Sequence, residues 1–167
     1  SSRAALAVIL FLTFTFNQTL NAQPITVVDD NGRTVELDQA AKRIISLAPS
    51  LTELLYDAGA GDYVIGVVEY SDYPEAATQL PIIGRHDRLD VERILALEPD
   101  LIIAWDSGNP KAAVRQLEQL GLTTYIAEPK SLASVADSLE RFSILAGTQN
   151  IGMTAAREFR SKLDSLV

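Results

Sequence analysis

The sequence predicts an α/β fold: one Rossmann-like lobe with a central parallel sheet flanked by helices, a β ribbon before it and a long helix after it. Two observations predict this fold. Segments with helical periodicity alternate along the chain with short apolar runs, which are typical of strands buried on both faces and lie at residues 43–48, 63–68, 101–104 and 123–127. Strands separated by helices of this length favour a parallel sheet with right-handed crossovers.

The ribbon is predicted from a turn signal. Residues 25–28 and 33–37 flank Asp29-Asp30-Asn31-Gly32. The Asn-Gly pair tolerates positive φ at both positions and is a strong hairpin signal. The ribbon therefore precedes the first buried strand, at residues 43–48.

Four helices are expected between and after the strands. The first follows a Ser-x-x-Glu capping box, in which Ser50 and Glu53 would satisfy the first turn, and Gly59 ends it. Gly121 closes the third helix in the same way. The four expected helices cover residues 51–58, 90–97, 110–120 and 131–146.

The last segment, residues 151–167, also has helical spacing, with Ala155, Phe159, Leu163 and Leu166 on one face. It carries no stop signal at its end. A terminal packing helix and a rigid connector to a second domain both fit this pattern, and the sequence alone leaves the two open.

Composition excludes several classes of function. The chain has 167 residues, of which 47% are apolar and 22% charged, which is enough for one core of its own. A net charge of −8 without a basic patch disfavours nucleic acid as a partner. The absence of cysteine excludes disulfides, thiolate metal sites and a cysteine nucleophile, and His86 is the single histidine. We therefore expect no resident metal and no catalytic triad.

Residues 1–22 are predicted to be a secretory signal peptide. Arg3 precedes an uncharged run over residues 4–16, and a polar stretch ending in Ala22 follows. The run is shorter than the about 20 residues of a membrane-spanning helix, although an uncleaved anchor is the alternative. Cleavage after Ala22 would leave the mature protein in the periplasm.

Aromatic and acidic side chains follow two of the predicted strands. Tyr70 and its neighbours follow residues 63–68, and Trp105 follows residues 101–104. The carboxyl ends of parallel strands form the ligand-binding edge of an α/β sheet. These residues are predicted to form one wall of a ligand cleft, although Trp105 could instead be a core residue between helices.

The chain resembles the periplasmic binding proteins of ABC importers for cobalamin, haem and iron siderophores. The residues that carry the resemblance are Ile25-Thr26-Val27-Val28-Asp29-Asp30-x-Gly32-Arg33-x-Val35, Lys42-Arg43-Ile44-Ile45-Ser46-Leu47-Ala48-Pro49-Ser50-x-Thr52-Glu53-Leu54-Leu55 and Gly61-Asp62-x-Val64-x-Gly66-Val67. Tyr70-Ser71-Asp72-Tyr73-Pro74 and Pro99-Asp100-Leu101-Ile102-Ile103-Ala104-Trp105 are most similar to the cobalamin-binding branch. The resemblance implies two α/β lobes joined by a long helix. Residues 23–148 would be the N-terminal lobe and residues 149–167 the start of the interlobe helix, with the second lobe absent.

The resemblance also implies roles for individual residues. Tyr70 and Trp105 would contact the corrin ring of cobalamin, and His86 would face the ligand without coordinating its metal, although an exposed loop histidine is the alternative. Asp72 and Tyr73 would support the turn that carries Tyr70. Haem and a ferric siderophore are the alternative ligands, because Arg85, His86 and Arg88 could serve either.

Glu92 is expected to dock onto arginines of the importer's permease in the inner membrane, a role that the resemblance implies. Its place early in a helix also fits a purely structural acid that interacts with the helix dipole.

An enzyme is disfavoured, because Ser46, Ser50 and Ser71 lack a nearby histidine signature and no Gly-x-Ser-x-Gly elbow or phosphate-binding glycine loop occurs. A single-lobe sensor or interaction domain remains a further possibility.

Overall fold

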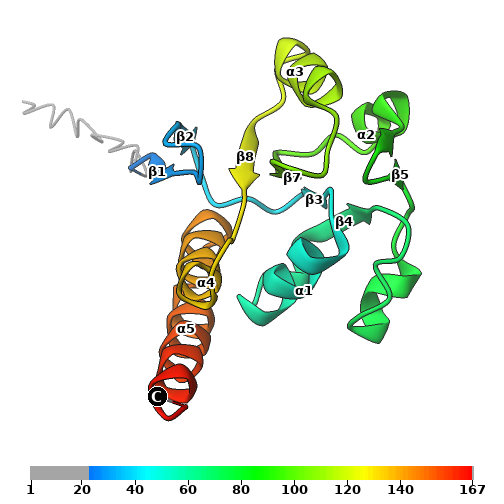
Figure 1. Ribbon diagram of the computed structural model, residues 1–167. Coiled ribbons are helices and arrows are strands. Elements are labelled where there is room, and N and C mark those ends of the chain that lie inside the picture. The colour runs from blue at the N-terminus through cyan, green and yellow to red at the C-terminus, as the bar shows by residue number, and fades with distance from the viewer. Residues whose placement is uncertain (1–22, 167) are drawn as a thin grey trace, which may run out of the picture.

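The computed structural model describes residues 23–166 and confirms the predicted α/β architecture (Figure 1). The expected signal peptide, residues 1–22, lies outside the described residues. Four parallel strands form the central sheet in the order β4-β3-β7-β8. Their bounds are Ile44–Ser46 for β3, Val64–Val67 for β4, Leu101–Trp105 for β7 and Thr124–Ala127 for β8.

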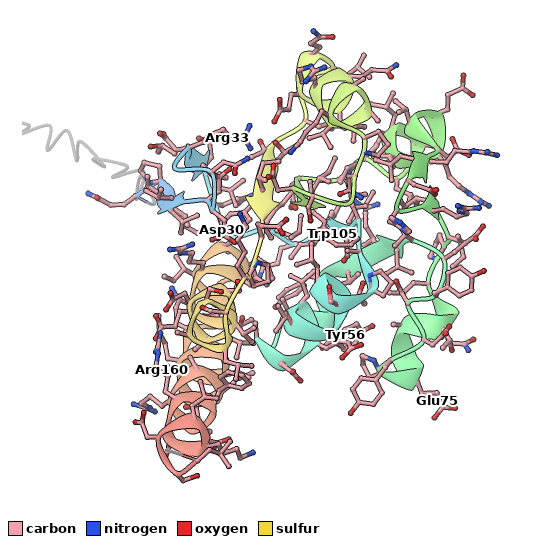
Figure 2. The ribbon with its side chains drawn as sticks, in the orientation of Figure 1. Asp30, Arg33, Tyr56, Glu75, Trp105 and Arg160 are labelled. Atoms are coloured by element: carbon pink, nitrogen blue, oxygen red, sulfur yellow. The ribbon has the colours of Figure 1, made fainter. Side chains whose placement is uncertain are left out.

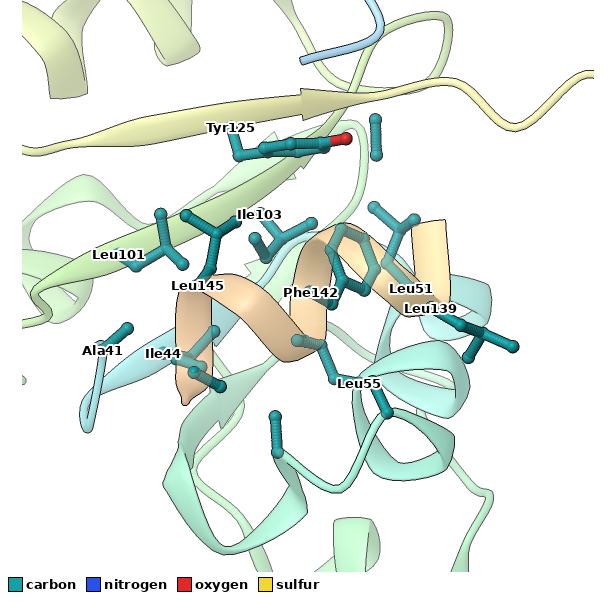
Figure 3. Close-up of a cluster of buried hydrophobic side chains, with 14 of the residues drawn as sticks. Ala41, Ile44, Leu51, Leu55, Leu101, Ile103, Tyr125, Leu139, Phe142 and Leu145 are labelled. Atoms are coloured by element: carbon teal, nitrogen blue, oxygen red, sulfur yellow. The ribbon is translucent and has the colours of Figure 1, made fainter. Parts of the chain in front are cut away.

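Alternate side chains of the buried strands supply two separate cores. On one face, Ile44, Ile103 and Tyr125 pack with helices α1 (Pro49–Asp57) and α4 (Leu132–Ala146), as Figure 3 shows. On the other face, the neighbouring residues Ile45 and Ile102 pack with helices α2 (Val91–Ala96) and α3 (Lys111–Gln119). Because successive side chains of a strand point to opposite faces, the continuous apolar runs in the sequence fill both layers.

Helix α1 begins differently from the prediction. Its first residue is Pro49, its N-cap is Ala48, and no side chain caps it, so the predicted Ser50–Glu53 capping box is wrong. Proline has the φ of a first helical residue and lacks the N–H that would need a partner there. A capping box does form at α4, where the side chain of Ser131 accepts from Ser134 N–H and Ser134 reciprocates.

The ribbon of β1 (Ile25–Val28) and β2 (Thr34–Leu37) is attached to the lobe through its turn. The buried Asp29 carboxylate accepts from the backbone N–H of Ile126 at 3.2 Å, and Asp30 accepts from that of Glu128 at 2.7 Å. Asp30 also forms an ion pair with Arg141 of α4 at 2.6 Å. The ribbon thus lies beside β8 (Figure 1).

A segment that the sequence did not indicate borders the other edge of the sheet. Residues 81–84 run beside β4, where Val67 N–H donates to Pro81 O at 3.0 Å and Ile83 N–H to Val67 O at 2.8 Å. This segment leads into a small hairpin of β5 (Gly84–Arg85) and β6 (Arg88–Leu89). Two short 3₁₀ turns, η1 (Gly61–Tyr63) and η2 (Glu75–Gln79), precede β4 and this segment respectively.

Helix α5 (Gln149–Asp164) lies antiparallel along α4 after a turn at Gly147, whose φ is 72°. Gly152 allows close approach, because a Cβ there would overlap the side chain of Ser143. Further along, Arg160 forms ion pairs with Asp137, at 2.7 Å, and with Glu140. Within residues 23–166, no helix combines the length and the apolar character needed to span a bilayer.

Candidate ligand-binding site at the carboxyl edge of the sheet

The loops that follow the four parallel strands meet at one edge of the sheet. Because the paired strands run in the same direction, their carboxyl ends lie side by side. This edge is where α/β sheets bind their ligands. The loops are residues 47–48 after β3, 68–74 after β4, 106–110 after β7 and 128–131 after β8.

Trp105, the last residue of β7, lines an open groove at this edge. Its indole is partly buried and lies beside helix α1 (Figure 2). The groove is also lined by Ser50, Leu51, Glu53, Leu54 and Asp57 of α1 and by Glu128, Pro129 and Val135. The indole is therefore neither exposed on a bare surface nor sealed in the core.

The groove beside Trp105 is acidic. Among residues 23–166, the charged side chains that line it are Glu53, Asp57 and Glu128, and no basic side chain lines it. Glu128 is held in place because Ser107 donates to it twice, from the backbone N–H at 2.8 Å and from Oγ at 3.0 Å. Carboxylate oxygens only accept hydrogen bonds, so this groove favours a ligand that carries N–H or O–H donors.

His86 joins Trp105 at the same edge. It lies in the turn between β5 and β6, is partly buried, and its ring centroid is 5.7 Å from that of Trp105 with the planes tilted by 52°. The neighbouring Arg85 makes a bidentate ion pair with Asp87, at 2.9 and 2.6 Å. The Arg85 guanidinium lowers the pKa of Asp87 from its ordinary value. Trp105 and His86 thus form an aromatic pair at this edge of the sheet.

The loop after β4 places its tyrosines in solvent. The side chains of Tyr70 and Tyr73 are 75% and 66% exposed, and Tyr70 adopts a φ of 68°. Asp72 is also exposed and takes part in no hydrogen bond between described residues. The buried residue of the loop is Ser71, whose hydroxyl lies 3.5 Å from that of Thr52. Tyr70 makes no aromatic contact with Trp105 within residues 23–166, so any ligand that touches both must bridge them.

Glu92 lies in the first turn of α2 and does not line the groove beside Trp105. Its neighbour Asp90 is the N-cap and accepts from the backbone N–H of Arg93 at 3.0 Å. The Glu92 side chain is exposed and forms no ion pair with any described residue. Capping is thus performed by Asp90, which leaves the Glu92 carboxylate available to a partner.

Asn109 is the residue of this edge that sequence analysis missed. Its side chain is only 6% exposed, and its carboxamide bonds to three chain segments of the site. The only local signal was a Gly-Asn-Pro sequence, which indicates a loop and says nothing of distant partners.

Among the described residues, no group of three or more histidine, cysteine, aspartate or glutamate side chains could hold a metal ion.

Comparison with known sequences identifies the family. The sequence profile of the periplasmic binding protein family matches residues 44–167. The vitamin B12-binding protein of Vibrio cholerae serotype O1 is 46% identical over 126 residues, which are 75% of this chain and 46% of that protein. The vitamin B12-binding protein of Yersinia pestis is 42% identical over 128 residues. The chain spans about half the length of the curated relatives it matches.

Comparison with solved structures supports the same family assignment. The crystal structure of the periplasmic vitamin B12 binding protein BtuF of Vibrio cholerae superposes with a TM-score of 0.73 over 75% of this chain and 49% of that one. A periplasmic haem-binding protein of Pseudomonas aeruginosa is 27% identical and superposes with a TM-score of 0.69, over 75% of this chain and 45% of that one. By sequence profile, by identity to named relatives and by fold, this chain belongs to the periplasmic binding protein family.

Proposed function

We propose that this chain is a cobalamin-binding lobe of a periplasmic solute-binding protein that captures the corrinoid and delivers it to an ABC importer. The observation that carries the proposal is the groove that Trp105 lines together with residues of α1, with His86 packed beside the Trp105 ring. Relatives at 46% and 42% identity are named vitamin B12-binding proteins, and the family consists of binding proteins rather than enzymes.

The chemistry of the groove suits a corrinoid. A corrin is a broad, flat ring fringed with amide groups, so a binder needs an aromatic surface for the ring and acceptors for the amide N–H donors. Trp105 supplies the surface, and Glu53, Asp57 and Glu128 supply acceptors. Tyr70 is exposed at the same edge of the sheet and is proposed to close over the ring from the loop after β4.

The charge of the groove supports cobalamin over the alternative ligands. Haem carries two propionates and ferric siderophores are commonly anionic, so three carboxylates in the groove oppose both. Arg85 already forms an ion pair with Asp87, so its guanidinium is less available to bind an anionic ligand. Haem remains the second candidate, because His86 offers an imidazole at the site and a haem-binding protein superposes on the chain.

A calorimetric titration of the protein with cobalamin, cobinamide, haemin and a ferric siderophore tests the proposal. We expect the two corrinoids to bind at least about tenfold more tightly than haemin, a difference of about 1.4 kcal/mol. Tighter binding of haemin, with an absorption spectrum that reports imidazole ligation, would transfer the assignment to haem. Failure of all four ligands to bind would remove the solute-binding assignment.

Delivery to an importer is proposed to use Glu92. An exposed carboxylate that meets a cationic pocket on the permease would steer association and set the docking orientation. The site of action would be the periplasm, the compartment for which the family is named.

A charge reversal tests this role. Glu92→Arg should lower uptake of labelled cobalamin into cells by about tenfold or more, because like charges would then meet at the docking surface. The Kd for cobalamin should not change, since Glu92 lies outside the Trp105 groove. Glu75→Arg is the matched control, because Glu75 is an exposed acid on η2, another part of the surface (Figure 2). Equal uptake by the Glu92→Arg and Glu75→Arg proteins would contradict the docking role.

A further inference from the structure

Asn109 joins three separate segments at the carboxyl edge of the sheet. Its Oδ1 accepts from the backbone N–H of Trp105 at 2.6 Å. Its Nδ2 donates to the carbonyl of Leu47, directly after β3, at 2.9 Å and to the carbonyl of His86, in the β5–β6 turn, at 2.8 Å. The backbone N–H of Asn109 in turn donates to Trp105 O at 3.0 Å, which closes the loop after β7 on itself.

These contacts require an amide at position 109. A carboxamide has one acceptor oxygen and two N–H donors in one plane, and here all three groups are used. An ionised aspartate could still accept from Trp105, but its second oxygen would face two carbonyl oxygens. Because the side chain is 6% exposed, water cannot replace the missing donors without opening the loop.

The loop that Asn109 closes also fixes the indole itself. Gly108 lies against the ring of Trp105, where a Cβ would overlap the six-membered ring. The backbone of Trp105 and the backbone of His86 are both bonded to the Asn109 side chain, which therefore links the two segments that carry the rings. We propose that Asn109 is a positioning residue that holds Trp105 and His86 together and so shapes the ligand-binding groove; its effect on affinity rests on the proposed function.

The chain contains one tryptophan and one histidine, so each ring gives a single set of NMR signals. In the ligand-free chain we expect nuclear Overhauser contacts between the imidazole of His86 and the indole of Trp105. Asn109→Ala and Asn109→Asp should abolish these contacts and make Trp105 fluorescence more accessible to acrylamide. Thr148→Ala is the matched control: it removes a side-chain donor that bonds a distant carbonyl, Ala58 O at 2.7 Å, but lies away from the groove.

Several outcomes would overturn the proposal. Unchanged ring contacts in either folded Asn109 variant would show that the amide does not position the pair, and so would an equal loss in Thr148→Ala. If neither Asn109 variant folds, hydrogen exchange in the wild-type chain tests the proposal instead. The Asn109 carboxamide protons should exchange slowly with solvent. Exchange at the rate of a free amide would contradict the hydrogen bonds described above.

Ligand affinity is a separate measurement. If the wild-type protein binds cobalamin, the folded Asn109 variants should bind it about tenfold more weakly, whereas Thr148→Ala should bind it normally. Equal affinity in the variants would limit Asn109 to a structural role. If the wild-type protein binds no corrinoid, the proposed function fails, while the ring contacts in the ligand-free chain still test the positioning role.

Discussion

Replacement of Trp105 by alanine is expected to weaken cobalamin binding by about 30-fold, or about 2 kcal/mol, which is the effect of removing a central aromatic anchor from a binding site. In the described part of the chain, the indole is the one aromatic ring that lines the groove between α1 and the loop after β8. Its loss would remove the flat surface and leave His86 without its packing partner. Titration calorimetry with the alanine variant measures the change directly.

Trp105→Phe is the matched control for this experiment. Phenylalanine keeps a flat apolar ring at the same strand end, so its Kd should lie within several-fold of the wild-type value. Both variants should retain the circular dichroism spectrum of the parent protein, because the indole is only partly buried. A Kd for Trp105→Ala within twofold of wild type would mean that the corrin ring does not rest on the indole.

The largest expected effect on stability comes from Phe142 of α4. Its ring is fully buried between the sheet and α1, and it meets Tyr125 edge-on with the centroids 5.5 Å apart (Figure 3). Phe142→Ala would lose this packing and leave a cavity, at a cost of about 3–5 kcal/mol in the free energy of unfolding. Since domains of this size have only about 5–15 kcal/mol in total, the variant should lose between about a fifth and all of its stability at 25 °C.

Urea denaturation, with one variant of the same helix as the control, measures this effect. Leu132→Ala removes an apolar side chain that is 60% exposed at the start of α4, and should change the free energy of unfolding by less than about 0.5 kcal/mol. Phe142→Leu should fall between the two. A loss below about 1 kcal/mol for Phe142→Ala would mean that α4 is not packed as described.

The parts of the fold that could be predicted are those governed by local chemistry. β3 and β7 are buried on both faces, so their apolar runs are visible in the sequence. The Asn31-Gly32 pair indicates the turn of the ribbon. The start of α1 was predicted wrongly because two local signals compete there. Pro49 is pre-set for the first helical position, and its effect outweighs the Ser50–Glu53 pattern.

The candidate site was only partly visible, because its geometry depends on distant contacts. Aromatic residues after strands indicate Trp105 and Tyr70 as candidates, but nothing local reveals that Trp105 packs with His86 while Tyr70 stands in solvent. The β5–β6 hairpin that carries His86 has two residues in each strand, too few for any alternation to be seen. Asn109 bonds to carbonyls 62 and 23 positions away, and such partners are set by the fold as a whole.

The anchoring of the ribbon to β8 has a practical consequence for expression of the lobe. The family profile starts at residue 44, after the ribbon has ended. A protein trimmed at that boundary would leave the backbone N–H groups of Ile126 and Glu128 without the aspartates that accept from them, and would strip Arg141 of its ion-pair partner Asp30. The smallest unit worth producing on its own therefore begins ahead of Ile25, where β1 starts.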